Sequence, residues 1–411
     1  MRKPRPSPLD VYPRRPPSSL FSRLERARSY PVFELCLVCA GLLFMLAMSG
    51  EVYGARYGTT MNPDVQSWLD SARGMTWFYD TGRREPAHPF VVRLILGVVP
   101  DPEQALRLTT VLETALAAIC GYAMARVLLG RVNALIVHLM FCCNPVVIFY
   151  SVSGMREPLQ TALAAAYVTL LVASTRRKSI SLAIGAGVVG AALVLTRTYG
   201  ATLVVALVML SFVCTVRQGR SAVSFRRDLM VMVVMLCVTT TLAIPRLFVP
   251  GDNVVNVDLM YWRGIEVLGR PGDLDTIGSI TLGEFIFADG KSILQVAALY
   301  LGNIVRYFTD YLPFFLRGFG WGSLIAIMGM LISLRRALFE LPLGLIASLA
   351  PLLPIMHLNQ QHGSLGIESR FLLPSLPFAL CLFVVAIEAA LGAAHRIFGA
   401  RAAVAPDLTD G

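Results

Sequence analysis

Acidic residues and arginines gather where apolar segments of the chain begin or end. Arg84-Glu85-Pro86 and Arg156-Glu157-Pro158 repeat one pattern, and Arg197 stands between two apolar blocks. A proline in the first turn starts a helix, and the positive end of that helix favours a carboxylate at Glu157 as its N-cap. Two interpretations are open: capping with local charge pairing, or carboxylates held ionised at a cavity. A carboxylate of the second kind can serve as a general base.

Motifs of several other chemistries do not occur. The sequence has no HExxH, no GxSxG and no GxxxxGK[ST], which argues against zinc peptidases, nucleophile-elbow hydrolases and P-loop ATPases. The five histidines have no metal-ligand spacing, and His138 is expected to pack inside an apolar block. All eight cysteines lie in apolar blocks, so disulfides between loops are not expected.

These residues belong to an unusually apolar chain. Of its 411 residues, 55% are hydrophobic and 15% are charged, whereas soluble proteins have about 45–50% and about 25%. The apolar residues form blocks of about 17–24, the length that crosses a bilayer as a helix. The sequence therefore predicts an all-α polytopic membrane protein with about 10 transmembrane helices. The expected spans are 32–49, 105–128, 132–150, 158–174, 179–196, 198–216, 229–244, 316–334, 339–357 and 371–392.

Charge patterning predicts the orientation of these spans. If all ten alternate, 21 basic residues of the termini and turns fall on one side, which the positive-inside rule places in the cytoplasm. The net charge of +10 is then explained by the membrane rather than by a nucleic-acid partner. Arginine outnumbers lysine 33 to 3, which favours a bacterial plasma (inner) membrane.

This orientation defines the domain organisation. Residues 1–30 are predicted to be a disordered basic cytoplasmic tail, 31–392 a single transmembrane domain, and 393–411 a short cytoplasmic tail with both termini inside. Two long segments, 50–104 and 245–315, then face outward. Both are amphipathic, and we expect juxtamembrane helices within them to lie along the membrane surface, as at 89–99. A span at 292–310 would break the charge alternation.

Six short motifs follow one another along the chain. They are Asp64-Val-Gln-Ser-Trp68, Arg84-Glu85-Pro86-Ala-His88-Pro89, Ala105-Leu-Arg107-Leu, Asn144-Pro145 followed by Arg156-Glu157-Pro158, Leu195-Thr196-Arg197, and Glu368-Ser-Arg370-Phe-Leu-Leu-Pro374. In this order they resemble the GT-C superfamily of polyprenyl- or dolichyl-phosphate-sugar-dependent glycosyltransferases. The nearest branch includes the protein O-mannosyltransferases and the bacterial aminoarabinose transferases.

Two departures from the family pattern bear on the site and the acceptor. The first acid of the family is often a paired Asp-Glu, whereas Asp64 is followed by Val65. The chain also ends near residue 411 without the C-terminal outer domain of larger members, so large folded acceptors are less expected.

The resemblance implies a hexosyl- or pentosyltransferase of the cell envelope. Such an enzyme moves a sugar from a polyprenyl-phosphate donor to an acceptor hydroxyl of a lipid, glycan or protein at the outer membrane face, with inversion. Alternatives are a polymerase or ligase of lipid-linked polysaccharide, and a multi-span transporter or flippase of lipid-linked glycans. No clear internal repeat supports the transporter.

The resemblance also suggests roles for individual residues. Asp64 is the expected base, and Glu157 orients the acceptor or shares that role. Arg197 and Arg370 are expected to hold the lipid phosphate, because planar guanidinium groups match its oxygens. The remaining substrate-binding candidates are Glu85 and His88, with a divalent metal ion as in some relatives, Trp68 as a platform for the sugar or an anchor at the interface, and Arg84 and Arg156, for which pairing with neighbouring glutamates is the alternative.

Overall fold

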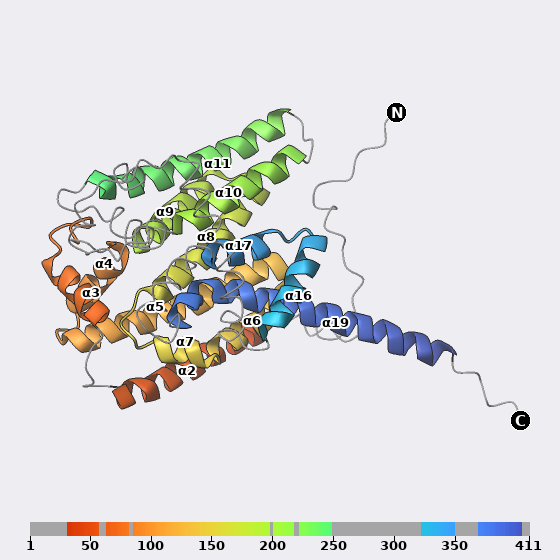
Figure 1. The fold of residues 1–411 in the computed structure, drawn as a ribbon, viewed down its shortest axis with the longest axis horizontal. Helices are drawn as coiled ribbons and strands as arrows, with labels where there is room; N and C mark the ends of the chain where they lie inside the picture. Colours follow the sequence, from red (N-terminus) through yellow and green to blue (C-terminus); the bar gives the residue numbers. More distant parts are fainter. Residues whose placement is uncertain are drawn as a thin grey trace, which may run out of the picture.

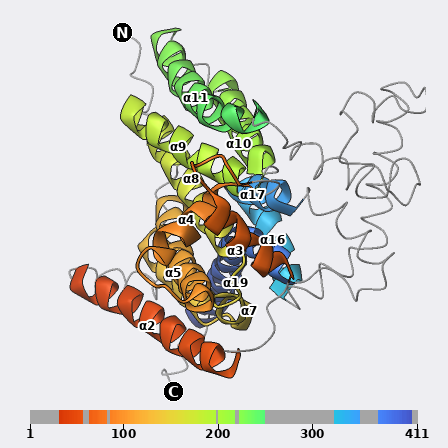
Figure 2. The same cartoon turned by 90° about the vertical axis from the view of Figure 1, so that its left-hand side faces the viewer.

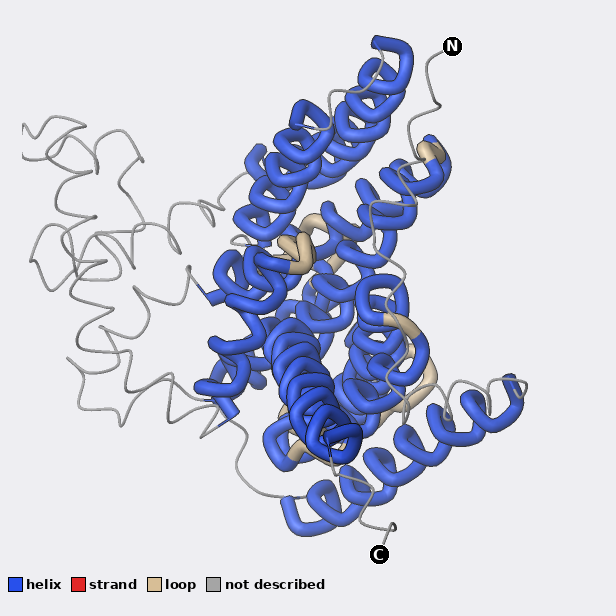
Figure 3. Tube along the Cα trace, turned by 90° about the vertical axis from the view of Figure 1, so that its right-hand side faces the viewer, coloured by secondary structure: helices blue, strands red, loops and turns tan. Residues whose placement is uncertain are grey.

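The computed structural model describes residues 31–56, 63–81, 85–197, 200–217, 222–248, 322–349 and 369–404. Within these ranges every regular element is a helix and no strand occurs (Figure 3). The predicted all-α fold is therefore confirmed. The expected tail 1–30, most of the segment 245–315, Arg84 and Glu368 lie outside the described residues.

Long helices make up most of the structure. They are α2 (Pro31–Arg56), α5 (Pro102–Leu129), α8 (Glu157–Arg177), α9 (Ile180–Thr196), α10 (Gly200–Arg217), α11 (Ala222–Ala243) and α19 (Leu376–Val404). The shorter elements are α3 (Pro63–Gly74), α4 (Ala87–Leu96), α6 (Arg131–Cys142), α7 (Pro145–Tyr150), α16 (Gly322–Arg335), α17 (Glu340–Leu349), and the 3₁₀ turns η2 (Ile244–Phe248) and η4 (Ser369–Ser375).

A helix stands at each of the ten predicted spans. Six helical stretches in the described part of the chain are long and apolar enough to cross a membrane. They are Pro31–Ala55, Pro102–Leu129, Glu157–Arg177, Gly200–Arg217, Ala222–Arg246 and Leu372–His395. The other four predicted spans coincide with α6, α9, α16 and α17, which are apolar helices of 10–17 residues. The protein is thus a membrane protein with several transmembrane helices, and the count of ten spans stays a prediction.

One predicted span is two helices in the structure. The segment 132–150 is divided into α6 and α7 at Asn144-Pro145. Proline disfavours a helical residue before it and lacks the N–H that would continue the helix. Asn144 instead caps α7, since its side chain accepts a hydrogen bond from the Val146 N–H at 2.9 Å.

Local signals also account for the boundaries of α5. Its N-cap Asp101 accepts a hydrogen bond from the Gln104 N–H at 2.8 Å, and Pro102 follows in the first turn. The helix ends at Gly130, whose φ of +90° is a conformation that favours glycine.

The core is a layered bundle in which α5 packs on α8, α8 on α9, and α9 on α11. Small residues allow the last of these contacts. A Cβ at Gly187 would lie 2.7 Å from the Cβ of Val238, and the Thr239 hydroxyl donates to the Gly187 carbonyl at 3.1 Å. Such close approach is typical of helix pairs in membranes.

Helices α3 and α4 gather at one end of this bundle, beside the N-terminal end of α5 (Figures 1 and 2). Helix α4 packs on α3, α5 and α9. The loop after α3 is tied to the end of α11, because Tyr79 donates its hydroxyl to the Leu242 carbonyl and accepts a hydrogen bond from Arg246 at its own carbonyl. The segment 50–104 therefore does contain short helices, and they cover the bundle end where α8 begins and α9 ends.

The opposite end of the bundle is where α19 leaves (Figure 1). This helix runs to Val404, whereas the last span was predicted to end at 392. The residues assigned to a short tail thus begin as a continuation of the same helix.

Candidate active site

Two buried ion pairs join distant parts of the chain at the α3–α4 end. Arg156 pairs with Glu85 through Nη1 and Oε2, and Arg197 Nη1 lies 3.0 Å from Glu157 Oε1. Side-chain exposure is at most 9% in all four residues. The repeated Arg-Glu-Pro pattern therefore forms bonds between elements, from the start of α4 to the start of α8, and from α8 to the end of α9.

Helix termini explain where the charges of the second pair lie. Glu157 was predicted to be the N-cap of α8, but it is the first residue of the helix, and the N-cap is Arg156. Arg197 is the C-cap of α9. A carboxylate at a helix N-terminus and a guanidinium at a helix C-terminus are both favoured by the helix dipole. Arg156 lies at a positive helix end, so its charge needs the partner carboxylate of Glu85.

Trp68 of α3 lies under the first pair and is 2% exposed. The Arg156 guanidinium lies over its ring, 4.6 Å from the centroid, a cation–π contact. The His88 ring meets Trp68 edge-on at 5.8 Å. Trp68 is thus buried between two candidate site residues.

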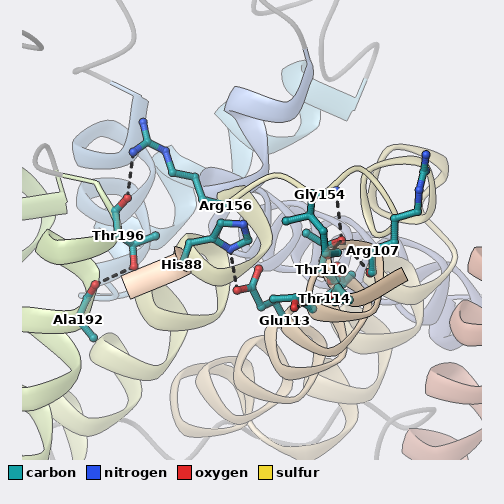
Figure 4. A network of polar contacts seen from close by, with 12 residues as sticks. His88, Arg107, Thr110, Glu113, Thr114, Gly154, Arg156, Ala192 and Thr196 are labelled. Carbon is teal, nitrogen blue, oxygen red and sulfur yellow. Dashed lines mark hydrogen bonds and ion pairs between the residues drawn. The ribbon is translucent and has the colours of Figure 1, made fainter. Parts of the chain in front are cut away.

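His88 joins this group to the middle of α5. Its Nδ1 lies 2.9 Å from Glu113 Oε1, and both residues are buried (Figure 4). On the other side of the site, Arg156 donates to the Thr196 carbonyl at 3.2 Å (Figure 4). Contacts therefore run from α5 through α4 and α3 to α8 and α9.

Glycine at position 154 brings α3 against the start of α8. Its φ is +75°, and a Cβ there would lie 2.8 Å from Val65 Cγ1 and 2.9 Å from Leu106 Cδ2. The Gly154 N–H also donates to the Thr110 hydroxyl at 3.3 Å. Val65 follows Asp64 in the sequence, so the first turn of α3 lies beside the segment that leads to Arg156 and Glu157.

The electrostatics keep Glu85 ionised. Burial alone would raise the pKa of Glu85, but the nearby charge of Arg156 and the more distant charge of Arg197 act against it, and the net result is a lowered pKa. A carboxylate held in this way is a hydrogen-bond acceptor and a fixed negative charge rather than a strong proton acceptor.

Two predicted site residues, Asp64 and Arg370, belong to described helices, but their side chains are not among the described parts of the structure. Asp64 is the second residue of α3, so the segment 64–72 is helical as expected. Trp68 and Ala72, one and two turns later, are buried on one face of that helix. Arg370 belongs to η4, which packs on α8, α7 and α17.

Sequence reasoning missed Glu113, which the structure places in contact with His88. A signal was present, because Glu113 is an isolated acid inside the predicted span 105–128, and ionisable residues within spans are functional candidates. Gln160 was missed as well; it lies one turn after Glu157 and is 5% exposed. Nothing in its residue type or spacing marked it.

The described side chains do not form a metal centre. Among them, no group of three His, Cys, Asp or Glu residues is arranged to hold an ion. Glu85 and Glu157 are each directed to an arginine. The divalent metal ion that the resemblance implied therefore lacks a ligand set in this part of the chain, and we derive no step from it.

Comparison with known proteins agrees with the fold. Residues 83–244, from the segment before α4 to the start of η2, match the family model of dolichyl-phosphate-mannose-protein mannosyltransferase. The structure also superimposes on the apo form of the oligosaccharyltransferase of Archaeoglobus fulgidus with a TM-score of 0.61 and 13% sequence identity. The chain has the GT-C glycosyltransferase fold. The fold that the resemblance implied is confirmed, and four of the six motifs lie within the residues that match the family model.

A second solved structure extends this likeness. The same GT-C enzyme, archaeal oligosaccharyltransferase AglB in complex with an inhibitory peptide and a dolichol-phosphate, matches with a TM-score of 0.57 at 13% identity. That alignment covers 91% of this chain and 52% of AglB, so the chain spans about half the length of the solved structures it matches. No curated protein matches the sequence.

The residues that match the family model contain only part of the candidate site. Glu85, His88, Arg156, Glu157 and Arg197 lie within 83–244. Asp64 and Trp68 lie before it, and Arg370 lies after it. The structure joins the earlier segment to the matched one through the contacts of Trp68 and Val65.

Proposed function

We propose that the protein is a membrane glycosyltransferase that moves a sugar from a polyprenyl-phosphate donor to an acceptor hydroxyl, with inversion. The observation that carries this proposal is the buried pair of carboxylates and arginines at one end of a GT-C fold. Charges that cluster at a membrane boundary are costly to bury, and they favour a functional site over a purely structural one.

Asp64 is the proposed general base. Helix α3 is held in place by buried Trp68 and by the contact of Val65 with Gly154, and Asp64 stands in its first turn. In the reaction, the acceptor oxygen bonds to the anomeric carbon while the bond from that carbon to the phosphate oxygen breaks. The hydroxyl proton goes to Asp64, and the phosphate leaves with the electron pair.

Glu157 has a different proposed role. Its contact with Arg197 at 3.0 Å holds the carboxylate in a fixed position. The arrangement favours the orienting role for Glu157 over the shared base role. A carboxylate fixed at the start of α8 can accept a hydrogen bond from an acceptor or sugar hydroxyl and so hold it in place.

Arg197 and Arg370 are the proposed phosphate ligands. Arg197 is buried at the end of α9, and η4 brings residue 370 beside α8. Guanidinium groups stabilise the negative charge that grows on the leaving phosphate in the transition state. Arg156 and Glu85 shape the neighbouring wall, where Trp68 supports the guanidinium.

The partners follow from the same comparison. AglB is described in complex with a dolichol-phosphate and an inhibitory peptide, which supports a polyprenyl-phosphate donor and leaves a lipid, glycan or protein acceptor. The chain matches about half of AglB, so the acceptor has to be identified by assay and not from the similarity to AglB.

A donor panel tests the proposed function. The purified protein is mixed with polyprenyl-phosphate sugars of several hexoses and pentoses, and sugar release is measured with and without candidate acceptors. We expect release and transfer from a monophosphate-linked donor. Use of diphosphate-linked glycans alone would favour a polymerase or ligase, and movement of an intact donor across vesicles without transfer would favour a flippase.

The proposal includes an orientation in the plasma membrane. The end of the bundle that holds the site faces away from the cytoplasm, and both termini are cytoplasmic. Asp80→Cys and Asp273→Cys are placed in a background without the eight native cysteines, with Arg220→Cys as the internal control. An impermeant thiol reagent should label the first two in intact cells, and the control only after lysis. The reverse pattern would overturn this topology.

A further inference from the structure

Glu113 is a carboxyl group in the interior of the bundle, and neither the six motifs nor the proposed reaction uses it. It lies on α5 and is 3% exposed. Burying a carboxyl group in the apolar part of a membrane protein is expensive unless it is bonded, so such residues are functional candidates. Its contact partner is His88, whose exposure is 0%.

The contact geometry couples the ring hydrogens of His88 to Glu113, because Glu113 Oε1 lies 2.9 Å from Nδ1. With Glu113 ionised, the carboxylate can only accept, so Nδ1 donates and keeps its hydrogen. A protonated Glu113 would instead donate to Nδ1 and leave the ring hydrogen on Nε2. In the described part of the chain the buried Nε2 has no hydrogen-bond partner, and nothing there competes with Glu113 for control of the ring.

The ring of His88 is in turn part of the wall around the ion pairs. It meets Trp68 edge-on with an interplanar angle of 88°. The Arg156 guanidinium lies over the Trp68 ring, 4.6 Å from its centroid. Arg156 reaches both Glu85 and the Thr196 carbonyl. A rotation of His88 would therefore release Trp68 and shift the guanidinium that Trp68 supports.

We propose that Glu113 is a positioning residue, which holds His88 as the Nδ1–H tautomer and thereby fixes Trp68 and Arg156 at the site. Its effect on sugar transfer rests on the proposed function, whereas its effect on the tautomer does not. Side chains that hydrogen-bond to the second ring nitrogen of a metal-bound histidine have a similar role. Their loss typically reduces metal affinity or activity about 10- to 100-fold.

Nitrogen-15 NMR of the full chain in detergent tests the tautomer directly. The protein is labelled with ¹⁵N-histidine, and His88→Gln identifies the His88 signals among the five histidines. We expect hydrogen on Nδ1 in the wild-type protein, and loss of this preference in Glu113→Leu. A wild-type His88 with hydrogen on Nε2 alone would overturn the proposal.

Transfer assays test the consequence. Glu113→Leu should reduce kcat about 10- to 100-fold. Glu113→Gln, which keeps an acceptor oxygen, should retain Nδ1–H and transfer within about threefold of wild type. Thr109→Ala is the matched control, because Thr109 is also buried on α5 and its hydroxyl donates to the Ala105 carbonyl one turn earlier. It should leave both readouts unchanged.

Either variant can overturn the proposal if the other does not fold. A folded Glu113→Leu or Glu113→Gln with hydrogen on Nε2 and wild-type transfer would show that the tautomer does not matter. If the wild-type protein transfers no sugar from any donor, the proposed function fails, and the NMR arm still decides the tautomer.

Discussion

Both ends of the bundle carry ion pairs, but the two sets differ in burial. At the α3–α4 end, the arginine side chains of the pairs are 9% and 5% exposed. At the opposite end, Glu34 of α2 contacts Arg131, Arg126 and Tyr122, and its two arginines are 28% and 53% exposed. Arg336 and Glu388 repeat this pattern at 28% and 19%.

The difference separates charges that fasten helices from charges that form a site. At the Glu34 end, long side chains bury their stems and keep their charged groups near water. Such pairs contribute little each, and in the Arg336–Glu388 pair the loss of one partner leaves a charge that water can reach. At the other end, a carboxylate that loses its arginine stays buried and unpaired, which is far more costly. The same residue types therefore report different roles according to exposure.

The largest effect is expected for Asp64→Asn at the site end. Asparagine keeps the shape but cannot take a proton, so transfer should fall about 10²- to 10⁴-fold while donor binding survives. The control is Asp70→Asn, an exposed acid on the same helix that accepts a hydrogen bond from Gln66. Initial rates with a polyprenyl-phosphate sugar measure both. Wild-type transfer in Asp64→Asn would make Asp64 a helix cap and Glu157 the leading candidate for the base.

Arg156→Met compares the two ends by stability. It leaves Glu85 buried without its arginine partner and should lower the free energy of unfolding by about 3–5 kcal/mol. Arg336→Met at the other end should cost at most about 1 kcal/mol, because its pair is partly exposed. Unfolding by SDS in mixed micelles measures both. Equal losses would mean that exposure does not distinguish the two sets.

Gly154→Ala tests how α3 is held against the start of α8. The added Cβ meets Val65 and Leu106 at under 3 Å, and the residue has a positive φ, so we expect a loss of about 1–3 kcal/mol in stability and reduced transfer. Gly74→Ala is the control at the other end of α3, where a Cβ meets nothing within 4 Å. Unchanged transfer in a folded Gly154→Ala would separate α3 from the site.

Arg370→Lys tests the phosphate contact. Lysine replaces the planar guanidinium with a point charge. The transition state should lose about 1–3 kcal/mol of stabilisation, measured from the change in kcat/KM, and the protein should still fold. Arg335→Lys at the opposite end should have no effect on rate. Near-normal turnover of Arg370→Lys would exclude a bidentate phosphate contact there.

The smallest effect concerns pH. Because the folded-state pKa of Glu85 is lowered, its stabilisation is complete above the ordinary pKa of about 4.3 and disappears as the pH falls through the lower folded value. The difference in unfolding free energy between wild type and Glu85→Gln should stay constant from about pH 8 to 5 and shrink below about pH 4. Shrinkage already between pH 7 and 5 would indicate a raised pKa instead.

Much of the fold could be predicted because its signals are local. An apolar block long enough to span hydrocarbon must form a helix to satisfy its own backbone. A helix stands at each expected span, although Asn144-Pro145 divides one of them and α19 continues past the end of the last. The site was predicted in part for the same reason. Glu157 and Arg197 stand at helix ends, which proline and hydropathy mark in the sequence.

The partners of these residues could not be predicted, because they depend on which helices meet. The sequence by itself determined that the chain is helical, enters the membrane and collects charge at helix ends. Only the tertiary structure decided that Arg156 bonds Glu85, that Glu157 bonds Arg197, and that Glu113 reaches His88. Helix formation depends on neighbours three or four residues apart. These contacts instead join residues that are 71, 40 and 25 positions apart. Only the packing of α4, α5, α8 and α9 brings such residues together.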